Sequence, residues 1–266
     1  MKRVGFDLVD PTTPRLLRRR LAERDAYWTA SAAADAPVYG ERVLHRGREI
    51  YRSFEPGRSK LAAAIAKGWK GPFPGPGEFW LYLGAAGGTT ASHVADLVGP
   101  GGGVFAIEKS VRPFVRLLRV AERYPNLYPV LGDVRRWEEY DGLVAPVDGL
   151  YADLAAPDQV RLVEENARAF LRPRGRLLLA LKTASMGRER SPEEHRLEAF
   201  GRLGRSFELR AGVNLEPFHK RHYFVGGQLR PSGGLGAEPA RDRNLFRSPR
   251  RERRVGPRVR ATRATR

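Results

Sequence analysis

A regular alternation that begins at Phe79 constrains this chain more than any other feature of its sequence. Apolar runs of five or six residues alternate there with stretches whose apolar residues recur at helical spacing. This pattern predicts parallel strands joined by helices, which form a doubly wound α/β sheet. The expected strands cover residues 79–83, 103–107, 127–131, 147–152 and 174–182, and the expected helices lie near residues 89–98, 111–123, 158–170 and 192–203.

Two further apolar runs, residues 206–215 and 222–227, follow the last expected helix and are separated by a short connection. They predict an antiparallel hairpin at the end of the sheet. Five parallel strands and a closing hairpin are typical of the Rossmann-like, seven-stranded sheet of class I S-adenosylmethionine methyltransferases. Most NAD dehydrogenases have an all-parallel sheet instead.

The regions on either side of this pattern differ from it in composition. Residues 1–55 combine a basic stretch with short alternating segments, which predicts a small β-rich domain. The methyltransferase domain is expected over residues 56–228. Residues 229–266 are rich in Gly, Pro, Ser and Arg and poor in apolar residues, so we expect a disordered basic tail.

The charge of the chain points to a polyanionic partner. The net charge is +18, and residues 228–266 contribute twelve Arg against three acidic residues, which is half of the total. Nucleic acid is the favoured partner, and an acidic protein or a membrane surface are the alternatives. The arginines of the tail either contact RNA phosphates nonspecifically or form a solvated end.

Other classes of protein are excluded by what the chain lacks. It contains no Cys, so disulfides, thiolate metal sites and cysteine nucleophiles are ruled out. No apolar run approaches the roughly 18 residues that span a bilayer, and the first ten residues lack the apolar centre of a signal peptide. We therefore expect a cytoplasmic protein without a membrane partner.

A loop of small residues follows the first expected strand. It runs from Gly84 and Ala85 through Gly88 to Thr89 and Thr90, where a helix begins. Small residues allow the backbone to approach a ligand closely, and a helix N-terminus offers unpaired N–H groups. The loop is therefore either a nucleotide-cofactor site or an ordinary tight connection.

Three acidic residues stand at the ends of the next three strands. Glu108, Asp133 and Asp153 should converge on the crevice where such sheets bind ligands. Carboxylates would repel a diphosphate, whereas they suit the cationic sulfonium and the ribose hydroxyls of S-adenosylmethionine. They favour this cofactor over a dinucleotide, although each acid alone is equally well explained as a helix cap or a turn residue.

At this point the chain resembles fibrillarin, and its archaeal form in particular. The resemblance runs from about Tyr39 to Gly227 and is carried, in order, by YGERV, RSKLAAAIAKGW, WLYLGAAGGTTASHVADLVG, FAIEKS, YPVLGDVRRWEEY, VDGLYADLAAPDQ, LLALKTAS and EPFHKRH. It implies methyl transfer from S-adenosylmethionine to the ribose 2'-oxygen of rRNA or tRNA at positions selected by box C/D guide RNA. It also implies two protein partners, a Nop5-type scaffold and, through the RNA, an L7Ae-type protein.

The resemblance also implies roles for particular residues. The family's catalytic positions fall on Lys60, Asp153, Lys182 and His222. The positions implied to bind the cofactor are Gly84, Ala85, Thr89, Thr90, Glu108, Lys109, Asp133, Val134, Asp153 and Gln159. Lys182 would act either as a base or as a charged stabiliser of the developing alkoxide. His93 has no matching ligand cluster, and no metal site is expected.

Three departures from the family pattern bear on the cofactor site. Lys109 replaces a residue that is usually aromatic, Ala156 replaces a Gln, and Lys182-Thr183-Ala184-Ser185 stands where the family has Lys-Ala-Arg-Ser. The Ala156 change leaves room for a second hypothesis, a catalytically weak structural subunit of the RNA particle. A third is a methyltransferase that acts alone on protein.

Overall fold

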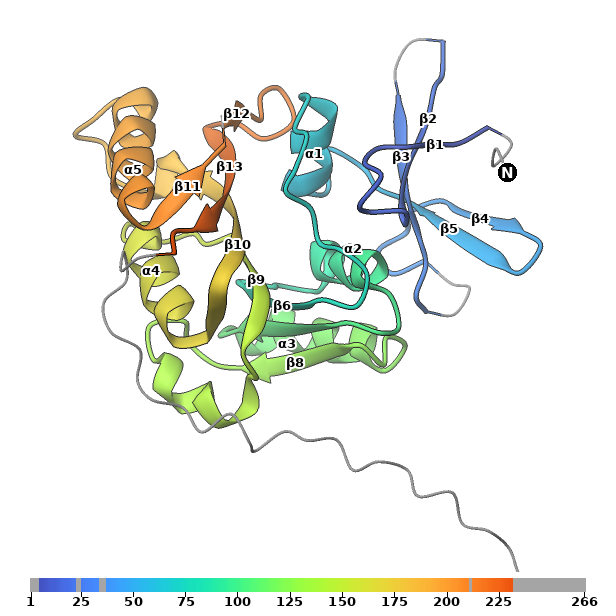
Figure 1. Cartoon of the computed structure of the whole chain (residues 1–266), viewed down its shortest axis with the longest axis horizontal. Coiled ribbons are helices and arrows are strands. Elements are labelled where there is room, and N and C mark those ends of the chain that lie inside the picture. Colours follow the sequence, from blue (N-terminus) through green and yellow to red (C-terminus); the bar gives the residue numbers. More distant parts are fainter. Residues whose placement is uncertain (1–4, 23–24, 34–36, 211, 232–266) are drawn as a thin grey trace, which may run out of the picture.

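The computed structural model describes residues 5–22, 25–33, 37–210 and 212–231 (Figure 1). Most of the predicted disordered tail, residues 232–266, lies outside the described residues. The N-terminal part is an antiparallel sheet of five strands in the order β1-β2-β3-β5-β4. These are β1 (Asp7–Leu8), β2 (Leu16–Arg19), β3 (Ala26–Ala30), β4 (Val43–Arg46) and β5 (Glu49–Ser53). The predicted β-rich character of this region is confirmed.

The second sheet has the predicted mixed topology. Its strands are β6 (Phe79–Leu83), β7 (Gly103–Glu108), β8 (Leu127–Leu131), β9 (Val147–Ala152), β10 (Leu171–Lys182), β11 (Phe207–Leu209), β12 (Val213–Asn214) and β13 (His222–Leu229). Seven of them follow one another in the order β11-β13-β10-β9-β6-β7-β8, and the short β12 pairs with β13. The run from β10 to β8 is parallel, whereas β13 is antiparallel to its neighbours. The predicted closing hairpin is therefore present.

The helices also lie close to their predicted positions. They are α1 (Lys60–Ala66), α2 (Thr89–Val98), α3 (Val111–Ala121), α4 (Gln159–Phe170) and α5 (Pro192–Ser206), with short 3₁₀ helices η1 (Trp137–Leu143) and η2 (Thr183–Ser185). Helix α5 extends beyond residue 203 until the chain becomes extended at Phe207, and a capping box of Ser191 and Glu194 stabilises its start. In the described part of the chain, no helix has the length and apolar character needed to cross a membrane.

Strand β10 differs most from expectation. It was expected to begin at residue 174, but it begins at Leu171, directly after α4. Its pairing with β9 shifts register between Leu171 and Arg176, and Arg174 between them has a left-handed φ of 59°. The irregular stretch interrupts the apolar pattern, which is why sequence periodicity missed the first three residues of the strand.

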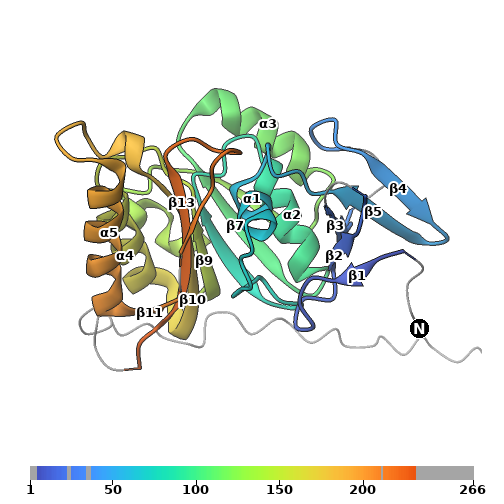
Figure 2. The same cartoon turned by 90° about the horizontal axis from the view of Figure 1, so that it is seen from above.

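Helices cover both faces of the sheet (Figure 2). Side chains of β6 alternate between the faces, so that Trp80 and Tyr82 pack in one core with α1, α2 and α3. Leu81 and Leu83 pack in the other core with α4 and α5. Helix α1 therefore lies on the same face of the sheet as Trp80 and Tyr82, and this arrangement places the site described below.

A buried arginine joins the N-terminal sheet to the second sheet's layer of helices. Arg52 of β5 is 1% exposed, and its guanidinium donates to Glu41 at 2.6 Å and to Asp96 of α2 at 2.8 Å. It also donates to the hydroxyl groups of Tyr124 at 2.6 Å and Ser92 at 3.1 Å. Burial opposes ionisation of Glu41, but Arg52 and backbone N–H groups outweigh it and lower the pKa of this carboxyl. Figure 1 shows the blue N-terminal strands beside α2, where this network lies.

His93 of α2 belongs to the same buried layer. Its Nδ1 lies 2.8 Å from the hydroxyl of Thr29 and its Nε2 lies 2.9 Å from the hydroxyl of Tyr39. Burial lowers the pKa of His93 well below its ordinary value, and the neighbouring Arg52 cation lowers it further, so the ring is neutral at pH 7. Among the described residues, no three His, Asp or Glu side chains gather as metal ligands would.

A neutral buried histidine makes stability depend on pH. The unfolded chain binds a proton at His93 below about pH 6.5, whereas the folded chain does not, so stability is lost as pH falls. We expect His93 to account for about 1.4 kcal/mol of the unfolding free energy lost per pH unit below about pH 6.5. Urea unfolding of the natural chain and His93→Gln at about pH 7.5 and pH 5.5 measures this contribution. An identical loss in both proteins would contradict it.

Candidate active site

The loop of small residues after β6 turns the chain sharply into α2. Gly84 and Gly88 have φ values of 80° and 84°, in the left-handed region that favours glycine. A Cβ atom on Gly84 would lie 2.5 Å from the carbonyl oxygen of Asp153, so only glycine allows the two backbones to approach this closely. The loop, including Ala85, and the N-terminus of α2 thus lie beside the end of β9.

Glu108, at the end of β7, holds this loop in place. Its Oε2 accepts from the backbone N–H of Ala86 at 2.9 Å, and its Oε1 accepts from that of Ser110 at 2.7 Å. Ala86 has a left-handed φ of 49°, which the bond to Glu108 helps to maintain. Each carboxylate oxygen retains a second acceptor position. Glu108 can therefore support the loop and accept a ribose hydroxyl at the same time.

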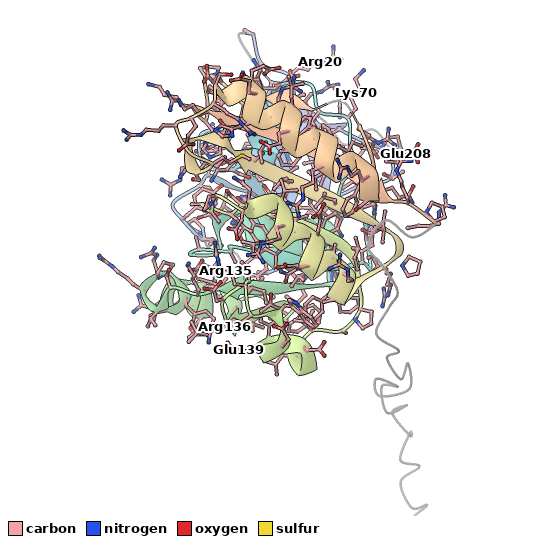
Figure 3. All side chains as sticks on the ribbon, turned by 90° about the vertical axis from the view of Figure 1, so that its left-hand side faces the viewer. Arg20, Lys70, Arg135, Arg136, Glu139 and Glu208 are labelled. Carbon is pink, nitrogen blue, oxygen red and sulfur yellow. The ribbon has the colours of Figure 1, made fainter. Side chains whose placement is uncertain are left out.

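Asp133, after β8, lies between two cations. Lys109 Nζ lies 3.9 Å from its Oδ2, and Arg135 Nη1 lies 3.9 Å from its Oδ1. Lys109 is 61% exposed, and Arg135 also lies at the surface near η1 (Figure 3). The side chain of Val134 is buried in the core, so only its backbone is available to a ligand. Lys109, which stands where the family usually has an aromatic residue, thus pairs with Asp133, one of the acids predicted to bind the cofactor.

The residues at this edge of the sheet fit S-adenosylmethionine. Glu108 ends β7, Asp133 and Asp153 follow the ends of β8 and β9, and the glycine turn brings the N-terminus of α2 to the same edge. Acidic side chains suit ribose hydroxyls and a sulfonium cation. Thr89 opens α2, whereas the buried hydroxyl of Thr90 donates to Ser59 at 3.1 Å and so contacts the residue that caps α1.

Lys60 and Asp153 form an ion pair in the described structure. Lys60 is the first residue of α1, and Asp153 follows the last residue of β9. Lys60 Nζ lies 2.7 Å from Asp153 Oδ2, and the two side chains are 26% and 17% exposed. The pair is therefore partly shielded from water but still reachable by a substrate. Two of the four residues predicted to be catalytic are brought into direct contact.

Lys182 and His222 are the other two, and they stand directly opposite each other. They are paired residues in the antiparallel ladder between β10 and β13. Directly opposite residues of such a ladder project from the same face. Counting in steps of two from Leu178 and Ala180, this is the face covered by α1. The register thus places Lys182 and His222 on the side of the sheet where Lys60 begins its helix.

Gln159 fixes the backbone of Lys182. The buried Gln159 side chain accepts from the N–H of Lys182 at 3.0 Å and donates to its carbonyl oxygen at 3.0 Å. Its amide also donates to the carbonyl of Ala156 at 3.1 Å. The resemblance implies that Gln159 binds the cofactor, but here its amide is committed to the protein backbone. We therefore assign it the task of holding the end of β10 against the start of α4.

His222 presents a neutral imidazole to the site. Its Nδ1 lies 2.7 Å from the carbonyl oxygen of Lys220, so Nδ1 carries the proton and Nε2 keeps its lone pair. Burial lowers the pKa of His222; the bond to Lys220 opposes this, and the cation of Lys60 adds to it. A neutral ring with an unprotonated Nε2 can accept a proton.

His219, within the segment EPFHKRH, is a site residue for which the sequence predicted no role. Its ring centre lies 5.9 Å from that of His222, and its Nε2 donates to the carbonyl oxygen of Pro56 at 2.8 Å. Burial lowers the pKa of His219, and the Lys60 cation adds to this, whereas hydrogen bonds to the backbone of Pro56 and Ser59 and the charge of Asp153 oppose it. The spacing of two histidines three residues apart was the only signal in the sequence, and it did not reveal the partner of either.

The chain is similar to known fibrillarins over most of its length. A family model described as fibrillarin matches residues 18–231. The fibrillarin-like rRNA/tRNA 2'-O-methyltransferase of Staphylothermus marinus is 46% identical over 189 residues, which cover 71% of this chain and 81% of the relative.

Two solved structures are similar over most of the chain. Aeropyrum pernix fibrillarin, in complex with natively bound S-adenosyl-L-methionine, has a TM-score of 0.74 at 36% identity, covering 84% of this chain and 98% of its own. Fibrillarin in a fibrillarin/Nop5p complex has a TM-score of 0.71 at 34% identity, covering 80% of this chain and 97% of its own. The predicted class I methyltransferase fold is confirmed, and the chain belongs to the fibrillarin family.

Proposed function

We propose that this chain transfers the methyl group of S-adenosylmethionine to the ribose 2'-oxygen of rRNA and tRNA, as the catalytic subunit of a guide-RNA particle. The observation that carries the proposal is the position of the Lys60–Asp153 ion pair, 2.7 Å long, on the same side of the sheet as the Lys182–His222 pair. Asp153 of the first pair lies against the glycine turn, and Lys182 of the second ends β10, the strand beside β9. Relatives in the family are named as rRNA/tRNA 2'-O-methyltransferases, and one binds S-adenosylmethionine.

The rate of this reaction depends mainly on how the reacting groups are positioned. The cofactor supplies a methyl group on a sulfonium that is already a good leaving group. The chain's residues must place the 2'-oxygen in line with that methyl group. They must also accept the hydroxyl proton or stabilise the charge that develops on the oxygen. Lys182 is our choice for the second task, with the Nε2 lone pair of His222 directly across the ladder to receive a proton.

Asp153 has two functions in this scheme. Its carboxylate holds the ammonium of Lys60, and its backbone carbonyl lies against the glycine turn that begins the cofactor loop. It therefore connects the residues that would hold the cofactor with those that would hold the ribose. Lys60 is neutralised by this pair, so it can orient a substrate oxygen without adding a free cation beside the sulfonium.

The partners follow from the family and from charge. A solved fibrillarin forms a complex with Nop5p, which supports a Nop5-type scaffold as the protein partner of this chain. Guide RNA, target RNA and an L7Ae-type protein that binds through the RNA complete the proposed particle. The net charge of +18 suits such an RNA assembly. We propose that the particle acts in the cytoplasm, on rRNA and tRNA.

Dependence on the guide tests this proposal. We expect tritiated methyl transfer to one guide-specified ribose when the chain is combined with guide RNA, target RNA and Nop5-type and L7Ae-type proteins. The chain alone should transfer far less, because base pairing with the guide selects the ribose and positions it. A guide shifted by one nucleotide is the matched control and should move the methyl group by one position.

Two other outcomes would favour the alternatives. Normal assembly and cofactor binding without transfer would indicate a structural subunit. Ala156 is the observation behind that alternative, because its small side chain is buried in the core and offers no amide to a ligand. Methylation of protein by the chain alone would indicate the stand-alone enzyme.

A further inference from the structure

We propose that His219 is a positioning residue for Lys60, acting through the carbonyl group of Pro56. The inference rests on the proposed function and adds a residue to the same site. Its basis is the hydrogen bond from His219 Nε2 to Pro56 O, 2.8 Å long, between residues 163 positions apart in the chain. One end of that bond is on the loop that leads into His222, and the other is on the segment that leads into Lys60.

The segment that leads to Lys60 is short and directly connected to it. Residues 54–59 link β5 to α1, and Lys60 is the first residue of that helix. The N–H groups of Arg58 and Ser59 both donate to the carbonyl of Glu55, which closes the segment into a turn. A shift of Pro56 within this turn is therefore transmitted to Lys60 and to its ion pair with Asp153.

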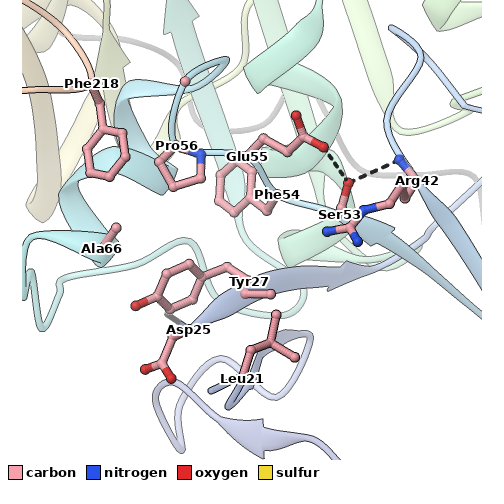
Figure 4. A pocket seen from close by; sticks show the side chains of 12 residues that line it. Leu21, Asp25, Tyr27, Arg42, Ser53, Phe54, Glu55, Pro56, Ala66 and Phe218 are labelled. Atoms are coloured by element: carbon pink, nitrogen blue, oxygen red, sulfur yellow. Dashed lines mark hydrogen bonds between the residues drawn. The ribbon is translucent and has the colours of Figure 1, made fainter. Parts of the chain in front are cut away.

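Packing leaves one side of this segment unsupported. A cavity of about 760 Å³ lies against Phe54, Glu55, Pro56 and Gly57, with Tyr27 of β3 on its far wall. Figure 4 shows Phe218, the residue before His219, next to Pro56 at the edge of this cavity. Where close packing does not fix a backbone, individual hydrogen bonds decide its position. The bond from His219 supplies such a constraint.

A second contact attaches the other end of the segment to the cofactor side. The Ser59 hydroxyl accepts from Thr90 of α2 at 3.1 Å and caps α1 by accepting from the N–H of Ala62 at 3.4 Å. The segment is thus held by α2 at Ser59 and by the loop before β13 at Pro56. Because that loop leads into His222, the His219 bond sets the distance between the Lys60–Asp153 pair and His222.

The chemistry of the ring suits this task. A histidine whose pKa is lowered by burial and by Lys60 stays neutral, so it donates a hydrogen bond without adding a cation that would compete for Asp153. Glutamine provides a neutral N–H donor of similar reach, whereas leucine has similar bulk and no donor. The two substitutions therefore separate the hydrogen bond from the volume of the side chain.

The test compares His219→Leu and His219→Gln in the assembled particle with guide RNA. We expect His219→Leu to lower kcat about 10- to 100-fold, as expected when a reacting group is displaced by about 1 Å. The Kd for S-adenosylmethionine and the Tm should stay near those of the natural chain, and His219→Gln should recover most of the rate. His45→Leu, in an exposed histidine of β4, is the matched control and should have no effect.

A double substitution and a spectroscopic measurement complete the test. If His219 acts through Lys60, His219→Leu should have little further effect in a Lys60→Ala background. An independent, full loss in that background, or equal losses in the Leu and Gln variants, would overturn the proposal. The NMR signal of the Lys60 side chain should also shift in His219→Leu and not in His219→Gln. That signal tests whether His219 positions Lys60 even if the natural particle transfers no methyl group. Absence of transfer would contradict only the proposed function.

Discussion

Lys182→Ala is expected to lower methyl transfer about 10²- to 10⁴-fold, which is the range for loss of a positioned acid–base or charge-stabilising group. S-adenosylmethionine binding should remain within a few-fold, because the glycine turn and the acids at the strand ends are untouched. The backbone of Lys182 should also stay in place, since its bonds to Gln159 do not involve its side chain. Single-turnover methyl transfer and calorimetric cofactor binding measure the two effects separately.

Lys182→Arg distinguishes the two roles proposed for the amine. An arginine remains charged at neutral pH and cannot act as a base. Partial activity in Lys182→Arg would identify a charge stabiliser, whereas a loss as large as that of Lys182→Ala would identify a base. Lys70→Ala, in an exposed lysine outside the site, is the control (Figure 3). Full turnover by Lys182→Ala would refute any catalytic role for this residue.

Arg52→Met is expected to cost about 3–5 kcal/mol of unfolding free energy, as found when one partner of a buried ion pair is removed. Methionine keeps most of the apolar stem, so the loss reports on the charge and its hydrogen bonds. Glu41 and Asp96 would remain buried without their shared cation. Urea unfolding at neutral pH measures the change, and the N-terminal sheet should separate from α2 first because Arg52 connects them.

Two further variants test this explanation. Adding Glu41→Gln and Asp96→Asn to Arg52→Met should restore part of the lost stability, because neutral amides cost less to bury than unpaired carboxylates. Arg136→Met, in an exposed pair with Glu139, is the matched control and should cost no more than about 1 kcal/mol. If the two arginine variants lose the same stability, burial of the network is not the source of its effect.

The sequence predicted the second sheet well, because its signals are local. Apolar runs and helical spacing located β6, β8, β9 and α2 to the residue, and the composition of residues 1–55 indicated a β-rich region. Prediction was poorer where the backbone departs from regular geometry, as at Arg174 in β10. A left-handed residue within a strand leaves no periodic trace in the sequence.

The candidate site was predicted in part. The resemblance supplied the residues implied to be catalytic, and the structure brings Lys60 and Asp153 together and places Lys182 opposite His222. The resemblance gave no indication that the amide of Gln159 hydrogen-bonds to the backbone of Lys182. Matching a residue to a family position does not reveal its hydrogen-bond partners, because a side-chain amide can bind a ligand or the backbone equally well.

By itself, the sequence determined the order and type of the main elements after residue 79, the glycine turn, the acids at the strand ends and the basic character of the chain. Periodicity, small residues and charge are properties of neighbouring residues, so they can be read along the chain. Only the tertiary structure decided that Arg52 pairs with Glu41 and Asp96, and that His219 donates to Pro56. It also decided the register of β13 on β10, and a shift of one residue there would turn His222 away from the face of Lys182. These contacts join residues distant in sequence, and they exist only after the sheet order and register are set.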